Sequence, residues 1–261
     1  MRRLLVWLSV VGMGVGIQGL LGTGSAFSEE QIPQAQISSL SGPVEWQKMG
    51  TRDWKVPGPN QKLSTGDRVR TGEKGQATLA LNEVGIIDLQ PGSEFAIQTL
   101  KRDAAAKKIE YVFGLPKGKI KAKVNPVSAG STLQFETPQA TVEIPPAGQD
   151  PTVTIAVNAD GSISVTSDDG NVWVIRHGDP AARLTLGAGE QVLVQFNQGT
   201  GALRLLDQSG TFDVIGPSGA PVTLNPGDAI VFQGGAATFI PVNPGADAGV
   251  ADTLNEPVSG G

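Results

Sequence analysis

Four lysines alternate with small or apolar residues in the stretch KGKIKAKV, which ends at Val124. In an extended strand successive side chains point to opposite faces, so Lys117, Lys119, Lys121 and Lys123 would leave one face in a row, about 7 Å apart. Such a row of ammonium groups could bind a polyanion, for example lipopolysaccharide phosphate or an acidic glycan. It could equally be a solvated face, or a sheet edge that lysines protect from aggregation. The four lysines are the candidate binding site, with both interpretations open.

Residues for bond-making chemistry are scarce. His177 is the only histidine and there is no cysteine, so a Ser-His-Asp arrangement would have a single possible base. Asp160, Asp168 and Asp169 offer the hard oxygens that calcium prefers, but the spaced loop with a distal bidentate Glu is missing, and hairpin turns explain these residues more simply. We therefore expect no enzyme, no metal and no cofactor, and interpret His177 as an exposed turn residue.

Three tryptophans could stack on sugar rings. Trp46, Trp54 and Trp173 are scattered along the chain at positions expected to be in strands. Aromatic residues at such positions more often fill a core than form a binding surface. We expect them to contribute to the core.

The elements that position these residues are expected to be strands. The chain is rich in glycine and proline and poor in aromatics, and short apolar runs recur about every ten residues. This pattern predicts an all-β fold, either an irregular β-solenoid-like wrap or a two-sheet sandwich of short antiparallel strands. Asp-Gly turns predict a three-strand meander over residues 151–176, and only residues 102–108 look helical.

A corner motif recurs irregularly along the chain. Each copy has an apolar residue, two corner residues followed by glycine, and then Asp, Glu or Ser before the next strand. Glycine can supply a positive φ, and the polar side chain can accept hydrogen bonds from nearby backbone N–H groups. The copies are LSTGDRVR at Leu63, LQPGSEFAI at Leu89, LGAGEQVLV at Leu186 and LNPGDAIVF at Leu224.

The first residues resemble an export signal. Two arginines precede an apolar run from Leu4 to Leu21 and a small-residue cleavage site that ends at Ala26. We expect cleavage, which would leave no membrane span; an uncleaved anchor is the alternative. The expected organisation is a signal peptide (1–26), a leader (27–36), a β domain (37–200), a C-terminal β extension of the same body (201–240) and a disordered tail (241–261). The expected location is periplasmic or secreted.

Charge is unevenly distributed along the chain. Residues 101–123 contain eight Lys or Arg and two acidic residues, whereas residues after Pro126 contain three Arg and fourteen Asp or Glu. An exported chain with this balance is a poor candidate for nucleic-acid binding.

Several segments together resemble the FecR-like periplasmic domain. They are GPVEW at Gly42, TRDWKVP at Thr51, LSTGDRVRTGEKGQATLAL at Leu63, IIDLQPGSEFAI at Ile86, GLPKGKIKAKV at Gly114 and FETPQATVEI at Phe135. The resemblance covers roughly residues 37–195. It implies an exported, non-enzymatic β scaffold that binds another component of the bacterial envelope, most simply a protein.

Two departures limit what the resemblance implies. Family members usually follow the Thr-Pro segment with an Arg-Gly-Thr turn, whereas here Thr137-Pro138 leads to Ile144-Pro145-Pro146. Signalling members also carry a cytoplasmic helical segment for a sigma factor, and only three residues precede the apolar run here. We therefore expect an envelope protein as partner, with a polyanion or carbohydrate held by Lys117–Lys123 as the alternative.

Overall fold

The structure is a computed structural model. It describes residues 35–103, 105–146, 151–169, 172–176, 179–197, 202–210, 212–215, 221–233 and 236–241. These residues form strands throughout, with one short 3-10 helix at Asn82–Val84, so the all-β prediction is confirmed. The expected signal peptide, nearly all of the leader, and the tail after Pro241 lie outside the described residues.

Two sheets face each other. Sheet A contains, in order across it, β4 (Lys62–Leu63), β1 (Ala35–Ser41), β6 (Gln76–Ala80), β7 (Gly85–Leu89), the second part of β9 (Lys108–Val124), β12 (Thr152–Val157), β13 (Ile163–Asp169), β16 (Gln191–Asn197), β17 (Ala202–Ser209), β20 (Ala229–Gln233) and β21 (Ala236–Ile240). Sheet B contains β3 (Trp54–Lys55), β2 (Val44–Gln47), β5 (Arg68–Thr71), β8 (Glu94–Asp103), the first part of β9, β10 (Thr132–Glu136), β11 (Ala140–Glu143), β14 (Val172–Arg176), β15 (Asp179–Leu186), β18 (Phe212–Ile215) and β19 (Pro221–Leu224). All these pairs are antiparallel except β9 with β10, which is parallel.

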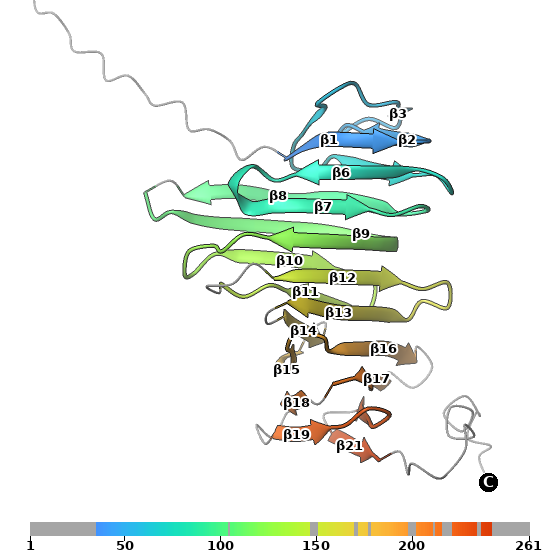
Figure 1. The fold of residues 1–261 in the computed structure, drawn as a ribbon, viewed down its shortest axis with the longest axis vertical. Helices are drawn as coiled ribbons and strands as arrows, with labels where there is room; N and C mark the ends of the chain where they lie inside the picture. The colour runs from blue at the N-terminus through green and yellow to red at the C-terminus, as the bar shows by residue number, and fades with distance from the viewer. Residues whose placement is uncertain are drawn as a thin grey trace, which may run out of the picture. The chain divides into compact units, whose positions relative to one another are not determined.

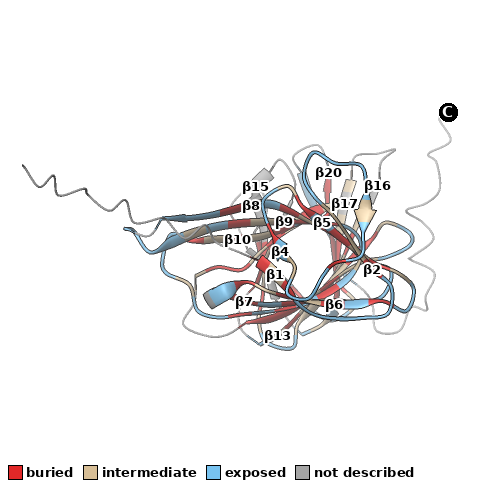
Figure 2. Cartoon of the chain, turned by 90° about the horizontal axis from the view of Figure 1, so that it is seen from above, coloured by how far each residue is buried: buried red, intermediate tan, exposed pale blue. Residues whose placement is uncertain are grey.

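The chain alternates between the two sheets. From β12 onward each hairpin in one sheet is followed by a hairpin in the other, and successive levels of strands follow the order of the chain (Figure 1). Figure 2 looks along this stack and shows β6, β7 and β13 on one side, with β8 and β10 opposite them. Each level therefore adds inward-facing residues to both walls of one interior.

The strand β9 belongs to both sheets. Its first part pairs with β8 and β10 in sheet B, and its second part, from Gly118 to Val124, lies between β7 and β12 in sheet A and pairs with both. The sequence predicts two strands here, over residues 108–113 and 117–124, but Pro116 and Gly118 lie within one continuous strand that passes between the sheets. Gly118 has a φ of 89°, a conformation that side-chain-bearing residues adopt only with strain.

Two local predictions were wrong. The segment at residues 102–108 is not helical, because β8 continues to Asp103 and Lys107 lies in a turn with a positive φ. The meander over residues 151–176 is correct only for the β12–β13 hairpin, since β14 leaves sheet A and pairs with β11 in sheet B. The alternation of apolar residues shows which side of a strand is buried, but it does not show to which sheet the strand belongs.

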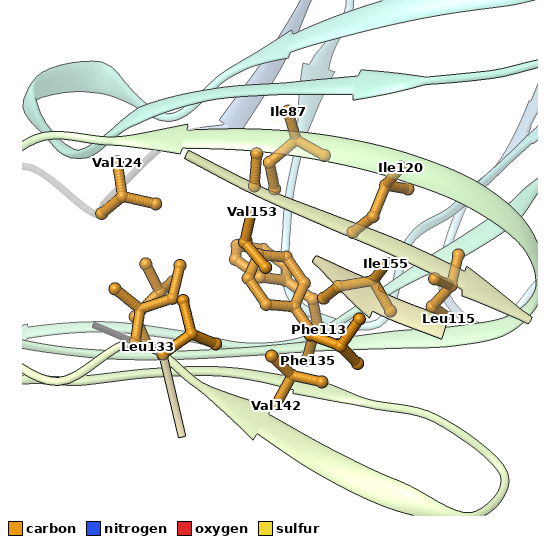
Figure 3. Packing of buried hydrophobic residues seen from close by; sticks show 14 of the residues in the cluster. Ile87, Phe113, Leu115, Ile120, Val124, Leu133, Phe135, Val142, Val153 and Ile155 are labelled. Carbon is orange, nitrogen blue, oxygen red and sulfur yellow. The ribbon is translucent and has the colours of Figure 1, made fainter. Parts of the chain in front are cut away.

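Phenylalanines fill the space between the sheets at the level of β9. Phe113 stacks on Phe95 with ring centroids 5.2 Å apart and lies 5.5 Å from Phe135. Figure 3 shows Phe113 and Phe135 facing aliphatic residues of sheet A, among them Ile120 and Ile155. All of these side chains are buried. The interior at this level is a packed core rather than a ligand channel.

Candidate functional site

The four candidate lysines lie on two sheets. Lys119, Lys121 and Lys123 are exposed on the outer face of sheet A and alternate with buried Ile120, Ala122 and Val124, as the sequence pattern predicts. Lys117 precedes the bend at Gly118 and pairs in sheet B, opposite Glu94. The structure therefore brings three of the four together.

Acidic residues surround the middle of this row. The Nζ atom of Lys121 lies 2.7 Å from a carboxylate oxygen of Asp168, and the hydrogen bond and charge of Asp168 raise the pKa of Lys121. Asp88 lies directly across on β7, and its charge and that of Asp169 act in the same direction. Because the pair is solvent-exposed, it contributes little to stability. The row is consequently a mixed-charge surface rather than a purely cationic one.

A shallow polar depression adjoins the lysine row on the outer face of sheet A. It has a volume of about 260 Å³, and its lining comes from β1, β6, β7 and Gln90. Thr78 Oγ1 donates a 2.7 Å hydrogen bond to Asp88, which also lines the depression. Its other polar lining residues are Ser39, Ser41, Gln76 and Gln90. Hydroxyl, amide and carboxylate groups thus lie beside the three lysines, a combination that suits a polar partner surface.

A second depression, of about 420 Å³, lies where the β8–β9 hairpin meets the 3-10 helix and the loop after β9. Val84, Ile109, Tyr111 and Val127 supply apolar lining, and Arg102 and Lys107 supply positive charge, the rest being Asn82, Pro126, Ser128 and Ser131. No acid, base and nucleophile converge there.

The corner motif has the geometry that its sequence predicts. Its glycines, Gly66, Gly92, Gly189 and Gly227, all have positive φ, and the four leucines that begin the copies are buried. The side chains after the glycines hold the backbone. Asp67 accepts hydrogen bonds from the N–H groups of Met49 (2.9 Å) and Ser64 (3.0 Å), and Asp228 accepts one from Asn225 N–H (2.9 Å). Glu190 accepts an equivalent bond from Gly187 N–H (2.6 Å), whereas Ser93 Oγ bonds to the backbone of Lys119 in β9. These polar residues are structural.

Each corner is hydrogen-bonded to the backbone of another strand. The carbonyl group of the polar corner residue accepts a hydrogen bond from the N–H of Ile97, Thr71, Ser167 or Asp207, in the order of the four copies. Asp207 differs from the other three because its side chain is ionisable. The residue is buried, with an exposed fraction of 1%. Neither of its side-chain oxygens makes a regular hydrogen bond to a described residue. Burial, followed by the charge of Glu190, raises the pKa of Asp207 to about 6.

Asp207 is not among the residues that the sequence singles out, although its position in the strand carries a signal. Leu205 and Asp207 are two residues apart in β17, so they share the inward face of the strand. An ionisable residue at an inward position of an alternating strand is a candidate for a perturbed pKa.

The remaining candidates have local roles or lie outside the described residues. Asp160 accepts hydrogen bonds from the N–H (2.9 Å) and hydroxyl (2.6 Å) of Ser162, which lower its pKa, and it caps the predicted β12–β13 turn. His177 is not among the described residues. Within the described part of the chain, no group of three or more acidic, histidine or cysteine side chains could hold a metal ion.

The tryptophans only partly match the prediction that they contribute to the core. Trp46 packs against the core from β2. Trp54 and Trp173 are half-buried, and the Arg70 guanidinium lies 4.2 Å from the centre of a Trp54 ring. A cation stacked in this way covers the face that a sugar would need.

Comparison with known proteins finds a family match. Residues 67–172 match the model of the FecR protein family, the family that the sequence segments resemble. The match runs from Asp67, the corner residue that precedes β5, to Val172, the first residue of β14. It includes the lysine row and the phenylalanine core.

Two crystal structures of a protein described as a "putative anti-sigma factor" from Parabacteroides distasonis ATCC 8503 are also similar. Sequence identity is 14% in each case, and the TM-scores are 0.40 and 0.39. The alignments cover 61% of this chain and 60% of theirs, so the chain spans about three fifths of their length. A comparison with curated proteins found no match. A helix with the length and hydropathy of a membrane span does not occur among the residues that the structure describes.

Proposed function

We propose that this chain is an exported, non-enzymatic scaffold of the bacterial envelope that binds a protein through its outer surface. The match to the FecR family and the export signal expected from the sequence support the location. The observation that carries the proposal is the filled interior: at the level of β9 the space between the sheets is taken up by Phe95, Phe113 and Phe135. Recognition then falls to the outer faces and edges of the sheets.

The outer face of sheet A is the best candidate surface for this partner. It combines exposed lysines, Asp88 and Asp168 with the adjoining polar depression. A surface of mixed charge favours specific pairing with a complementary protein surface. It attracts a uniformly negative polymer only weakly, because its carboxylates offset the charge of its lysines. The polyanion alternative retains one supporting observation, since Lys119 and Lys123 make no ion pair with a described residue.

Site-specific photo-crosslinking in cells tests the proposal. A photo-reactive residue at Ser39, in the depression, should give a discrete protein adduct, whereas the same residue at Lys55 in β3 of sheet B should give none. The adduct should form in high salt as well as in low salt. The double variant K119E/K123E distinguishes the alternative: binding to lipopolysaccharide or an acidic glycan that both this variant and high salt abolish, without any protein adduct, would refute the proposal.

A further inference from the structure

Three of the four ends of the two sheets are blunted. At the N-terminal end, β4 and β3 are two residues long, and the loop between them bonds to the sheet through the hydrogen bond from Ile37 N–H to Gln61 C=O (2.9 Å). At the C-terminal end of sheet B, β19 has four residues and begins with Pro221, which lacks an N–H donor. Short strands, covering loops and proline are devices that keep sheet edges from pairing with other chains.

Within the described part of the chain, the fourth end, β21 in sheet A, has none of these devices. Its sequence AATFI contains no charge and no proline, and its five residues pair with β20 in an unbroken register. No strand among the described residues pairs with its other side. The edge therefore presents a row of backbone donors and acceptors suited to an added strand.

The core is also left open at this edge. Phe239 pairs with Ile230, so the two side chains share the inward face of sheet A. Ile230 is 1% exposed, whereas Phe239 is 41% exposed. A further strand beyond β21 would cover this ring.

We propose that the occupant is β21 of a second copy of this chain, paired antiparallel about a two-fold axis at Thr238. In that register Thr238 lies opposite its own equivalent, and Phe239 lies opposite the small Ala237 of the other copy. Two aromatic rings therefore do not collide, and two threonines form a favourable cross-strand pair. Since β21 has no ionisable side chain, the strands meet without like charges. The contact is isologous and closes as a dimer.

Sedimentation velocity of the purified protein, with variants, tests the inference. The wild-type chain should form a dimer in a concentration-dependent manner, and T238K should shift it to monomer because two lysines would face each other. T166K, which places a lysine on the central strand β13 of the same sheet, should leave the dimer unchanged. Circular dichroism checks that both variants are folded.

A cysteine crosslink tests the register. The chain has no cysteine, so T238C introduces a single thiol that lies about 5 Å in Cβ distance from its partner across the two-fold axis. Mild oxidation should yield a covalent dimer with T238C and little with T166C. A wild-type protein that stays monomeric at tens of micromolar, a dimer that T238K does not weaken, or equal crosslinking of T238C and T166C would each overturn the inference.

Discussion

Asp228 and Asp207 are both buried carboxylates, but they differ in what surrounds their oxygens. Asp228 receives a hydrogen bond from Asn225 N–H, which compensates for lost water. Asp207 takes the place that Ser167 and Thr71 have at two other corners, where a neutral hydroxyl suffices. Its raised pKa means that the fold favours the protonated acid over the carboxylate.

The substitution D207S should stabilise the protein at neutral pH. The pKa of Asp207 rises from 3.8 to about 6 on folding. Wild-type stability should therefore be unaffected by this group below pH 4, fall as pH rises from about 4 to 6, and stay lower above that. A difference of about 2 pKa units corresponds to roughly 3 kcal/mol. Urea unfolding at pH 4 and pH 7.5 should show D207S more stable only at the higher pH.

The variant D228N is the matched control and should behave in the opposite way. Replacing this carboxylate weakens the hydrogen bond from Asn225 N–H, so the protein should lose about 1–2 kcal/mol at pH 7.5. If D207S lowers stability at pH 7.5 as D228N does, the carboxylate of Asp207 stabilises the fold. The prediction that this buried carboxylate destabilises the protein would then be wrong.

At the scale of single elements, β9 depends on one glycine. A Cβ atom at Gly118 would come within 2.3 Å of Ser93 Cα. Ser93 Oγ in turn accepts from Lys119 N–H and donates to Lys119 C=O, each at 2.9 Å. Ser93, a corner residue that precedes β8 of sheet B, thus holds β9 at the point where β9 enters sheet A. The row of lysines begins there with Lys119.

The substitution G118A should therefore be severe. It combines a strained positive φ with displacement of Ser93, and we expect a loss of about 3 kcal/mol. G92A is the control: its φ is also positive, at 73°, but no atom lies within 4 Å of the added Cβ, so about 1 kcal/mol should be lost. Thermal unfolding of the two variants measures the difference. Equal losses would mean that the contact with Ser93 does not constrain β9.

These elements also show what the sequence can and cannot predict. Strand positions followed from the alternation of apolar residues, which predicts strands over residues 85–89, 152–157 and 212–215, the bounds of β7, β12 and β18. The corner geometry followed from glycine and its polar neighbour. The sheet to which β14 belongs, and the salt bridge from Lys121 to Asp168, did not follow, because both depend on pairing between residues far apart in sequence. The edge strand β21 escaped prediction because the two large apolar residues of AATFI, Phe239 and Ile240, are adjacent and show no alternation.

At the scale of the whole described body, stability depends on a core that both sheets share. Phe113 contacts rings from β8 and β10 and faces aliphatic residues of sheet A (Figure 3). Levels farther along the stack contact mainly their immediate neighbours, since each strand pairs only with the strands beside it. Loss of a central ring should therefore weaken the contact between the two sheets in the middle of the stack.

The substitution F113A should cost about 4 kcal/mol, because it removes a fully buried aromatic ring and leaves a cavity. I86A, on the neighbouring strand β7, removes a side chain that is 40% exposed and should cost less than about 1 kcal/mol. Urea titration followed by tryptophan fluorescence gives both values. Similar small losses for the two variants would show that the phenylalanine layer is not the main contact between the sheets.

The course of β9 has a mechanical consequence. Where hairpins alternate, the two sheets are joined by connecting loops and by side-chain packing, and both can yield gradually under load. At β9 the same extended backbone is hydrogen-bonded into both sheets within 17 residues. A force that separates the sheets there must break rows of backbone hydrogen bonds together, so this level should be the last to open when the protein is stretched.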